Sequence, residues 1–277
     1  MRLISICPSN TEFIAYLGLT SHLVGVDDFS DWPEEIQSLP RLGPDLNIDM
    51  DKVEALKPDL VLASLSVPGM ERNVEELERR GIPYYTVPNP KKLNEVGDVL
   101  QLIGEKTNTT VRAEQVYKRF QEIMTTYNEI SATITKPKTI YWEWWPKPVF
   151  TPGKENWLTE MSELAGGNNV FADQPVASVK TDWEDVKNRN PDVISVVWVG
   201  VQKEKVQPKV ILKRPGWQEI TAIQEDQLFV LEEPFFCRPS PRLLIGLAKI
   251  ASILHPDKYP QFDEQDPLLI MDRPSNN

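Results

Sequence analysis

Apolar positions in the first part of the chain form short continuous runs that alternate with segments in which they recur every three or four residues. Continuous runs bounded by turn residues are typical of buried parallel strands, and the longer spacing is typical of amphipathic helices. Strands are expected at residues 3–6, 23–26, 59–63 and 83–87, and helices at 12–19, 50–57 and 71–80. Strands that alternate with helices predict a parallel sheet.

The second half of the chain has the same rhythm. Strands are expected at residues 139–142, 169–171, 192–197 and 228–231, and helices at 157–165 and 182–188. Each half therefore predicts a small Rossmann-like lobe, and the fold class is α/β with mainly parallel sheets.

One phrase occurs twice, as D-M-D-K-V-E-A-L-K-P-D-L-V at 49–61 and as D-W-E-D-V-K-N-R-N-P-D-V-I at 182–194. In each copy a short amphipathic helix stops before a proline, which cannot continue it, and an aspartate leads into a buried strand. The repeat predicts two copies of one lobe. A helix followed by Pro-Asp and a strand is also a common α/β turn, so chance agreement stays open.

The longest periodic segment lies between the two copies, with apolar residues spaced by threes and fours from Ala113 to Ile134. A helix of roughly 25 residues spans about 38 Å, enough to connect two lobes as a strut. The expected domains are an N-terminal lobe, a connecting backbone helix, a C-terminal lobe and a tail at residues 1–107, 108–135, 136–256 and 257–277. In the tail, D-E-Q-D-P and D-R-P-S-N-N are predicted at the surface or frayed.

Composition narrows the function classes. The net charge of −11 argues against nucleic acid, because no Lys/Arg stripe is present to displace counterions from phosphates. The apolar run needed to cross a bilayer is absent from the sequence. Leu3 to Ile6 before Cys7 are too short for a secretion signal, so the chain as encoded is expected in the cytoplasm, or outside it if Met1 replaces a removed leader. The two distant cysteines, Cys7 and Cys237, give no zinc-site spacing.

Aromatic residues gather where the predicted strands end, and ligands of parallel sheets bind at the carboxyl ends of the strands. Alternation along the strand assigns Trp142 to the core and makes Trp144 and Trp145 candidates for a cleft between the lobes. At the end of the first strand, Ser9 and Glu12 have the spacing of a capping box, which predicts a helix with its free N–H groups pointing into that cleft. A cap with no further role is the alternative.

The chain resembles the substrate-binding proteins of ABC importers for iron-siderophores, haem and cobalamin, and most closely the cobalamin-binding branch. The resemblance covers nearly the whole chain. The phrases that carry it are I-S-I-C-P-S-N-T-E at 4–12, V-E-A-L-K-P-D-L-V at 53–61, E-R-N-V-E-E-L-E-R-R-G-I at 71–82, P-V-F-T-P-G-K-E-N at 148–156, A-G-G-N-N-V-F at 165–171, R-P-G-W-Q-E-I at 214–220 and R-P-S-P-R at 238–242.

The resemblance implies two lobes joined by one long helix, with a non-catalytic role as a monomer that binds a bulky metal chelate. It also implies that Glu71 and Glu219 dock onto arginines of the membrane subunits, which can grip a carboxylate bidentately. Surface acids with no such role are the alternative. The candidate ligand-binding residues are Pro8, Ser9, Asn10, Phe29, Trp32, Ser66, Trp144, Trp145, Trp198, Phe236, Cys237 and Arg238.

Ligand chemistry favours cobalamin among the three classes. Aromatic walls suit a bulky, amide-fringed ligand, whereas a ferric siderophore calls for several arginines and Arg238 with Arg242 supply few. Haem calls for an axial Tyr, His or Met. Cys237 immediately precedes Arg238 in the expected cleft loop, where its thiol is either a metal ligand or a small buried group.

Three other readings stay open. A chain confined to the cytoplasm would hold a corrinoid, haem or siderophore without transport. A chelatase-like enzyme shares the two-lobed description, but P-G-K-E at 152–155 lacks the glycine and Ser/Thr of a phosphate-binding loop, and the acids form no distinctive catalytic pair. A scaffold that binds protein partners predicts exposed tryptophans. No catalytic residue, catalytic cofactor or resident metal site is predicted.

Overall fold

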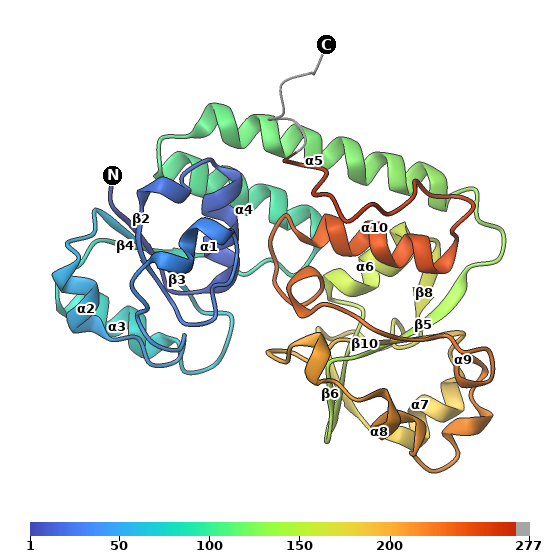
Figure 1. Ribbon diagram of the computed structural model, residues 1–277. Coiled ribbons are helices and arrows are strands. Elements are labelled where there is room, and N and C mark those ends of the chain that lie inside the picture. The colour runs from blue at the N-terminus through green and yellow to red at the C-terminus, as the bar shows by residue number, and fades with distance from the viewer. Residues whose placement is uncertain (270–277) are drawn as a thin grey trace. The chain divides into compact units, whose positions relative to one another are not determined.

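The computed structural model describes residues 1–269, and the chain divides into two compact units (Figure 1). Unit 1 comprises Met1–Pro90, Asn94–Phe120 and Pro239–Pro241. Unit 2 comprises Lys91–Leu93, Gln121–Arg238 and residues 242–269. The boundary falls inside helix α5, Thr110–Ser131, so the segment predicted as a separate connecting helix is divided between the units.

Unit 1 is built on a four-stranded parallel sheet in the order β2-β1-β3-β4. Its strands are β1 Leu3–Ser5, β2 Leu23–Val26, β3 Leu60–Ser64 and β4 Tyr84–Val87, and its helices are α1 Pro8–Tyr16, α2 Met50–Ala55, α3 Glu71–Arg79, the 3-10 turns η1 Thr20–His22 and η2 Glu34–Ser38, and most of α4 Leu93–Lys106. Ile4, Val61 and Ala63 of the sheet pack with Val53 and Leu77 of the helices in one buried cluster.

Unit 2 contains a second four-stranded parallel sheet, in the order β11-β10-β5-β8, and a three-stranded antiparallel sheet that the sequence analysis did not predict. The parallel strands are β5 Lys138–Glu143, β8 Gly167–Asn169, β10 Val193–Val196 and β11 Leu228–Val230. The antiparallel strands are β6 Trp145–Pro146, β7 Val149–Pro152 and β9 Ser178–Thr181. The helices are α6 Trp157–Leu164, α7 Trp183–Arg189, α8 Pro208–Leu212, α9 Thr221–Gln224 and α10 Leu243–Leu254, with 3-10 turns η3 Lys203–Lys205, η4 Trp217–Glu219 and η5 Glu233–Phe235.

The two parallel sheets share one topology. The strand that follows the repeated helix, β3 in unit 1 and β10 in unit 2, lies in each sheet between the unit's first strand and its last parallel strand. The two repeated helices begin alike as well. The Asp49 side chain accepts the Lys52 N–H at 3.1 Å, and the Asp182 side chain accepts the N–H groups of Glu184 and Asp185 at 3.0 and 2.9 Å. Such caps satisfy donors that the first turn leaves free.

The repeated Pro-Asp also has one role in both units. The Asp59 carboxylate accepts the N–H of Arg2 at 2.6 Å, and the Asp192 carboxylate accepts the N–H of Thr139 at 2.8 Å. Each aspartate thereby fixes the start of its own strand beside the start of the unit's first strand. The repeated phrase therefore forms the same structural device in both units.

The start of α1 corrects one prediction. The helix begins at Pro8, four residues before the expected start, and its N-cap is Cys7, with no side-chain cap hydrogen bond. A proline is well suited to the first helical position, because its missing N–H would have no partner there. Ser9 therefore lies inside the first turn and forms no capping box with Glu12. The Ser9 hydroxyl instead lies 3.3 Å from the Cys7 thiol, and Glu12 accepts a hydrogen bond from the Ser240 hydroxyl.

The C-terminal tail packs on unit 2 through two residues outside the stretches predicted at the surface. Tyr259 is 5% exposed, its ring stacks on Tyr127 of α5 with centroids 5.3 Å apart, and Leu268 is also buried. Asp263, Glu264 and Gln265 are exposed, as expected for D-E-Q-D-P. The D-R-P-S-N-N stretch lies outside the described residues. Within residues 1–269, no helix combines the length and apolar character needed to span a bilayer.

Candidate functional site

The end of strand β5 places three tryptophans of unit 2 in different environments. Trp142 is fully buried and donates its indole N–H to the Ser162 hydroxyl at 2.9 Å, which confirms its assignment to the core. Trp144 is half-buried and packs against Trp157, with ring centroids 6.3 Å apart, and its indole N–H has no hydrogen-bond partner in the described structure. Trp145, in β6, is 42% exposed. The exposed Trp145 ring beside the half-buried Trp144 ring offers aromatic surface to a ligand, whereas the Trp144 N–H itself is buried.

Glu143, between these tryptophans, is the centre of a buried polar network. Its carboxylate is 0% exposed and forms a bidentate ion pair with the Arg214 guanidinium, at 2.5 and 2.8 Å. The carboxylate also accepts the Tyr141 hydroxyl at 3.0 Å and the Trp198 indole N–H at 3.1 Å. A buried charge is tolerated when it is paired and hydrogen-bonded in this way. Trp198, a predicted ligand residue, is thereby fixed by a group that the sequence analysis did not select.

The Arg214 guanidinium lies between two aromatic rings. Its central carbon is 4.3 Å from the centroid of Trp217 and 4.9 Å from that of Trp183, distances at which a cation is attracted to a ring face. The Trp217 indole N–H donates to the Trp183 carbonyl at 3.1 Å, which joins the two ring-bearing segments. Burial and the neighbouring Glu143 carboxylate raise the pKa of Tyr141 well above its usual value, so this hydroxyl stays a donor to the pair. Two features of the sequence could have indicated this buried ion pair. They are the acid that ends the otherwise apolar run T-I-Y-W-E at 139–143 and the arginine that begins R-P-G-W at 214–217.

Residues 236–238 are buried or half-buried, and each has its own contacts within unit 2. Phe236 is 0% exposed and packs against Trp142 with ring centroids 5.5 Å apart, as a core side chain does. The Cys237 thiol donates to the Val197 carbonyl at 3.6 Å, and burial raises its pKa well above the usual value, so it stays a thiol at neutral pH. Arg238 is engaged by Glu233, with Nε 3.0 Å from the carboxylate. The favoured outcome for Cys237 is thus the small buried group.

The candidate residues of unit 1 that follow strand β1 lie at the beginning of α1. Pro8 is half-buried, whereas Ser9 and Asn10 are buried at 8% and 2% exposure. The Asn10 amide donates to the Ala63 carbonyl at 3.0 Å, which ties α1 to the end of β3. Burial raises the pKa of the neighbouring Cys7 thiol. Asn10 therefore has a structural partner, and Pro8 offers the most surface of the three.

The loops after β2 and β3 carry the other candidates of unit 1. Phe29 is 53% exposed, and Trp32 is half-buried against Tyr16 with ring centroids 5.5 Å apart. The Phe29 N–H donates to the Asp27 carboxylate at 2.9 Å, which shapes this loop. The Ser66 hydroxyl accepts from the Ser64 hydroxyl at 3.0 Å. An exposed phenylalanine on a hydrogen-bonded loop is the strongest ligand candidate of unit 1 by exposure.

The two predicted docking acids lie at the surfaces of their units. Glu71 opens α3, as predicted, and accepts the N–H of Gly69 at 2.7 Å. Glu219 ends η4, is 73% exposed and pairs with Lys187 of α7 at 3.0 Å. Both carboxylates are accessible from solvent, which a contact with a partner requires.

A pocket of about 500 Å³ opens beside the Glu219 turn. Pro146, Pro148, Trp183 and Pro215 supply apolar wall, while Asp182 and Glu184 add carboxylates to the lining. The Trp183 indole N–H donates to the Pro146 carbonyl at 3.2 Å and so connects the β6–β7 hairpin to α7. The ring that forms this wall is also one of the two that stack on Arg214.

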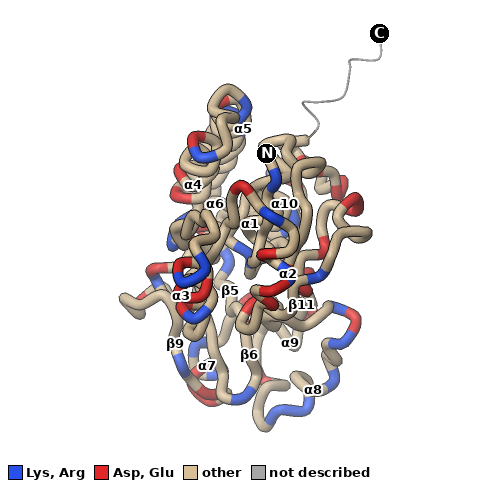
Figure 2. Tube along the Cα trace, turned by 90° about the vertical axis from the view of Figure 1, so that its left-hand side faces the viewer, with Lys and Arg blue, Asp and Glu red and all other residues tan. Residues whose placement is uncertain are grey.

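Charge on unit 2 is unevenly distributed. Figure 2 shows lysines along the segment that contains α8, where Lys205, Lys209 and Lys213 are exposed. Val206 and Ile211 of this segment are buried and hold it to the unit. This basic stretch is local, because the whole chain carries a net charge of −11.

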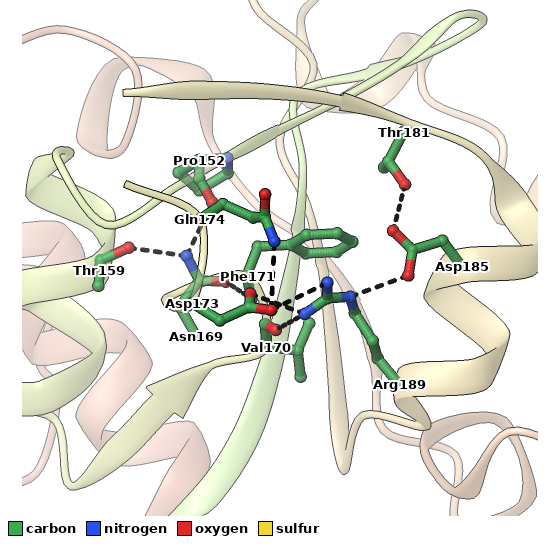
Figure 3. Close-up of polar contacts among 10 residues, drawn as sticks. All are labelled: Pro152, Thr159, Asn169, Val170, Phe171, Asp173, Gln174, Thr181, Asp185 and Arg189. Carbon is green, nitrogen blue, oxygen red and sulfur yellow. Dashed lines mark hydrogen bonds and ion pairs between the residues drawn. The ribbon is translucent and has the colours of Figure 1, made fainter. Parts of the chain in front are cut away.

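Asn169, Val170 and Phe171 of the A-G-G-N-N-V-F phrase take part in a network of contacts within unit 2 (Figure 3). The Asn169 amide donates to the Pro152 carbonyl at 2.8 Å and to the Thr159 hydroxyl at 2.7 Å. Arg189 lies 4.1 Å from the Phe171 ring centroid and pairs with Asp173 at 2.9 Å, a contact that lowers the Asp173 pKa. Among residues 1–269, no group of three or more His, Cys, Asp or Glu side chains is arranged to hold a metal ion.

Comparisons with known proteins place the chain in a family. Residues 3–234 match the family described as periplasmic binding protein. The chain is 32% identical over 262 residues to the uncharacterized ABC transporter substrate-binding lipoprotein YvrC of Bacillus subtilis, covering 93% of this chain and 81% of that protein. It is 28% identical over 257 residues to a vitamin B12-binding protein of Vibrio cholerae, covering 91% and 88%.

The fold agrees with the sequence matches. The solved periplasmic haem-binding protein RhuT of Roseiflexus superimposes with a TM-score of 0.81 at 21% identity, covering 92% of this chain and 98% of that one. A likeness at this identity supports the fold and leaves the ligand open. The predicted two-lobed α/β architecture and the resemblance drawn from the sequence are both confirmed. The chain belongs to the periplasmic binding protein family, a family of substrate-binding proteins and not of enzymes.

Proposed function

We propose that the protein is the receptor of an ABC importer for a bulky metal chelate, and that this ligand is cobalamin or a related corrinoid. Family membership and the match to a vitamin B12-binding protein over 91% of the chain support this proposal. The observation that carries the choice of ligand is the strand-end aromatic set of unit 2, formed by Trp144, Trp145 and Trp198. The arginine predicted beside this set, Arg238, is already paired with Glu233. Aromatic surface with few charges suits an amide-fringed macrocycle better than a ferric siderophore.

A titration tests the ligand. Purified, metal-free protein is titrated separately with cyanocobalamin, hemin and a ferric hydroxamate, following tryptophan fluorescence and the absorption band of each ligand. Saturable one-to-one binding of cyanocobalamin is expected. Binding of hemin or the ferric hydroxamate alone would keep the receptor role and replace the ligand, and binding of none of the three would overturn the proposal.

The aromatic set gives the first mutational prediction. Replacing Trp144→Ala and Trp145→Ala together removes two ring faces and weakens ligand affinity by more than about 1 kcal/mol, or roughly fivefold or more. Isothermal titration calorimetry of the variant and the wild type measures the change. Phe262→Ala is the matched control, because Phe262 is a half-buried aromatic residue of the tail and is not at a strand end. Unchanged affinity in the double variant would remove these residues from the site.

Delivery is proposed to use Glu71 and Glu219. Glu71→Lys and Glu219→Lys reverse the charge of two exposed acids and are expected to reduce stimulation of importer ATPase activity while ligand affinity stays unchanged. Glu75→Lys, one turn into α3, and Glu225→Lys are matched controls, because both side chains are exposed acids outside the proposed contact. Delivery also requires the protein on the outer side of the membrane, which cell fractionation of the full-length gene product tests.

A further inference from the structure

The Glu143–Arg214 ion pair joins two parts of unit 2 that the proposed function uses separately. On one side, the Glu143 carboxylate holds the Trp198 indole N–H at 3.1 Å. On the other side, Arg214 begins the turn that carries Glu219. Within this turn the Trp217 N–H donates to the Arg214 carbonyl at 3.3 Å, and the Glu219 N–H donates to the Gly216 carbonyl at 3.2 Å.

Unit 1 has no ion pair at the position equivalent to Glu143. In unit 1, Leu3 of β1 pairs with Leu60, the residue after Asp59; in unit 2, Ile140 of β5 pairs with Val193, the residue after Asp192. Counting three residues onward from Leu3 and Ile140 matches Ile6 with Glu143. Ile6 is 2% exposed, so unit 1 fills the equivalent position with an apolar side chain. A buried ion pair is weak evidence for a stabilising role, which leaves this one open to another purpose.

We propose that Glu143 and Arg214 are positioning residues, which fix the Trp198 ring for ligand contact and couple that contact to the turn that carries Glu219. This inference rests on the proposed function. Both carboxylate oxygens of Glu143 are engaged by Arg214, and the oxygen that accepts from Trp198 is one of the two. Rotation of the indole would break this bond and leave that oxygen of the ion pair with one donor fewer.

The stacking around Arg214 carries the coupling toward the surface. The guanidinium lies between the Trp183 and Trp217 rings, so a shift of Arg214 changes the packing of both. Trp217 precedes Glu219 by two residues, and Glu219 is held to α7 through Lys187. A change in the Trp198 contact thus reaches the docking turn through direct contacts within one unit.

A double-mutant cycle on ligand affinity tests the positioning step. One arm is Trp198→Phe, which keeps an aromatic ring and removes the N–H, and the other is Glu143→Ile with Arg214→Leu, which copies the apolar solution of unit 1. The ligand is whichever of cyanocobalamin, hemin and the ferric hydroxamate saturates the wild type. Each arm is expected to raise Kd about fivefold, the loss of one hydrogen bond, and the combined variant to be no weaker than either arm.

The matched control is the same pair replacement combined with Trp145→Phe, whose ring forms no hydrogen bond or stacking contact with Glu143 or Arg214 within residues 1–269. Here the effects on Kd should multiply. If the pair replacement fails to fold, Tyr141→Phe takes its place, because it removes a single 3.0 Å hydrogen bond to Glu143. Multiplying effects in the Trp198 cycle, or unchanged affinity in Trp198→Phe, would overturn the positioning role. A general loss of structure cannot produce coupling confined to one tryptophan.

Amide hydrogen exchange tests the coupling to the docking turn. Saturating ligand is expected to slow exchange at residues 214–219 in the wild type and to leave it unchanged in Trp198→Phe saturated with the same ligand. Equal slowing in both proteins, or no slowing in the wild type, would overturn the coupling. Wild-type protein that binds none of the three ligands overturns the proposed function itself, whereas binding with a multiplicative cycle overturns the inference alone.

Discussion

Strand β1 of unit 1 and strand β5 of unit 2 occupy equivalent places in two sheets of the same topology, and their ends differ in chemistry. The first strand continues into Ile6 and Cys7, both buried, and then into α1. The second ends in Glu143 and continues into Trp144 and the antiparallel strand β6. The same backbone device therefore supports an apolar end in one unit and a buried ion pair with aromatic neighbours in the other.

The two strand ends distinguish contacts that both units share from a contact that only unit 2 has. The aspartate contacts at Asp59 and Asp192 occur in both units, so they belong to the architecture. The Glu143–Arg214 pair occurs where unit 1 has Ile6, so the shared topology forms in unit 1 without such a pair. An added group that is costly to bury and bonded to a candidate ligand residue is best explained by positioning.

Breaking the ion pair should have the largest effect on stability. Arg214→Leu leaves the Glu143 carboxylate buried without its partner, and the free energy of unfolding is expected to fall by about 3–5 kcal/mol. Adding Glu143→Ile removes the stranded charge and should bring stability back to within about 2 kcal/mol of the wild type. Urea denaturation followed by circular dichroism measures both.

The comparison between units also supplies the control for this prediction. Ile6→Val changes the equivalent buried position of unit 1 by one methylene and should cost only about 1 kcal/mol. A double variant that remains as unstable as Arg214→Leu alone would show that the ion pair supports the fold, and the distinction drawn between the units would be lost.

The sequence predicted the parallel sheets because local patterns determine them. Strand β2 was predicted with its observed bounds, and β3 and α3 within one residue at each end, since short apolar runs and periodic helices leave a clear signal. The sheet formed by β6, β7 and β9 was missed. Trp145–Pro146 is a strand of two residues, too short for any alternation to be seen, and its pairing with Phe150 and Val149 depends on a turn through Lys147-Pro148.

The candidate site was predicted less completely than the fold. Alternation assigned Trp142 to the core correctly, because the period of a strand is a local property. Glu143 and Arg214 are 71 residues apart, and no local pattern shows that they meet. The burial of Phe236 against Trp142 is likewise a contact between distant segments. Ligand contacts at the remaining predicted residues stay predictions.

The packed tail adds to unit 2 a contact that has no counterpart in the repeated phrase, and removing this contact should have a smaller effect on stability. The Tyr259 hydroxyl donates to the Leu164 carbonyl at 2.8 Å, and burial, with a smaller effect of Tyr127, raises the pKa of Tyr259 to about 12. Tyr259→Phe removes the hydrogen bond and should lower the free energy of unfolding by about 1 kcal/mol at pH 8.

The pH dependence has a defined sign. An unfolded tyrosine ionises near pH 10, roughly its usual pKa. Because the folded pKa is raised, the Tyr259 contribution is fully present below about pH 10 and is lost as pH rises toward 12. Wild-type protein should therefore lose more stability than Tyr259→Phe between pH 8 and 11 in urea denaturation. Tyr117→Phe, in α5, is the control, and parallel pH profiles for wild type and Tyr259→Phe would contradict the prediction.

The smallest expected effects lie inside the repeated phrase, at the residue before its proline. Lys57 and Asn190 both adopt left-handed backbone, with φ of 48° and 44°. This conformation costs a lysine about 1–2 kcal/mol, whereas asparagine tolerates it, so Lys57→Gly should stabilise the protein by about 0.5 kcal/mol after the entropy cost of glycine.

Asn190→Gly should have the opposite sign, because asparagine does more here than tolerate the turn. Its side chain donates to the Thr221 hydroxyl at 2.9 Å and accepts the Thr221 N–H at 2.8 Å. Losing these exposed hydrogen bonds should cost about 1 kcal/mol. Thermal and urea denaturation of Lys57→Gly and Asn190→Gly measure the change in stability of each variant relative to the wild type. Changes in stability of the same sign would mean that the two turns work alike. Opposite signs would show that the turn in unit 2 is stabilised by side-chain contacts with α9, which the turn at Lys57 does not depend on.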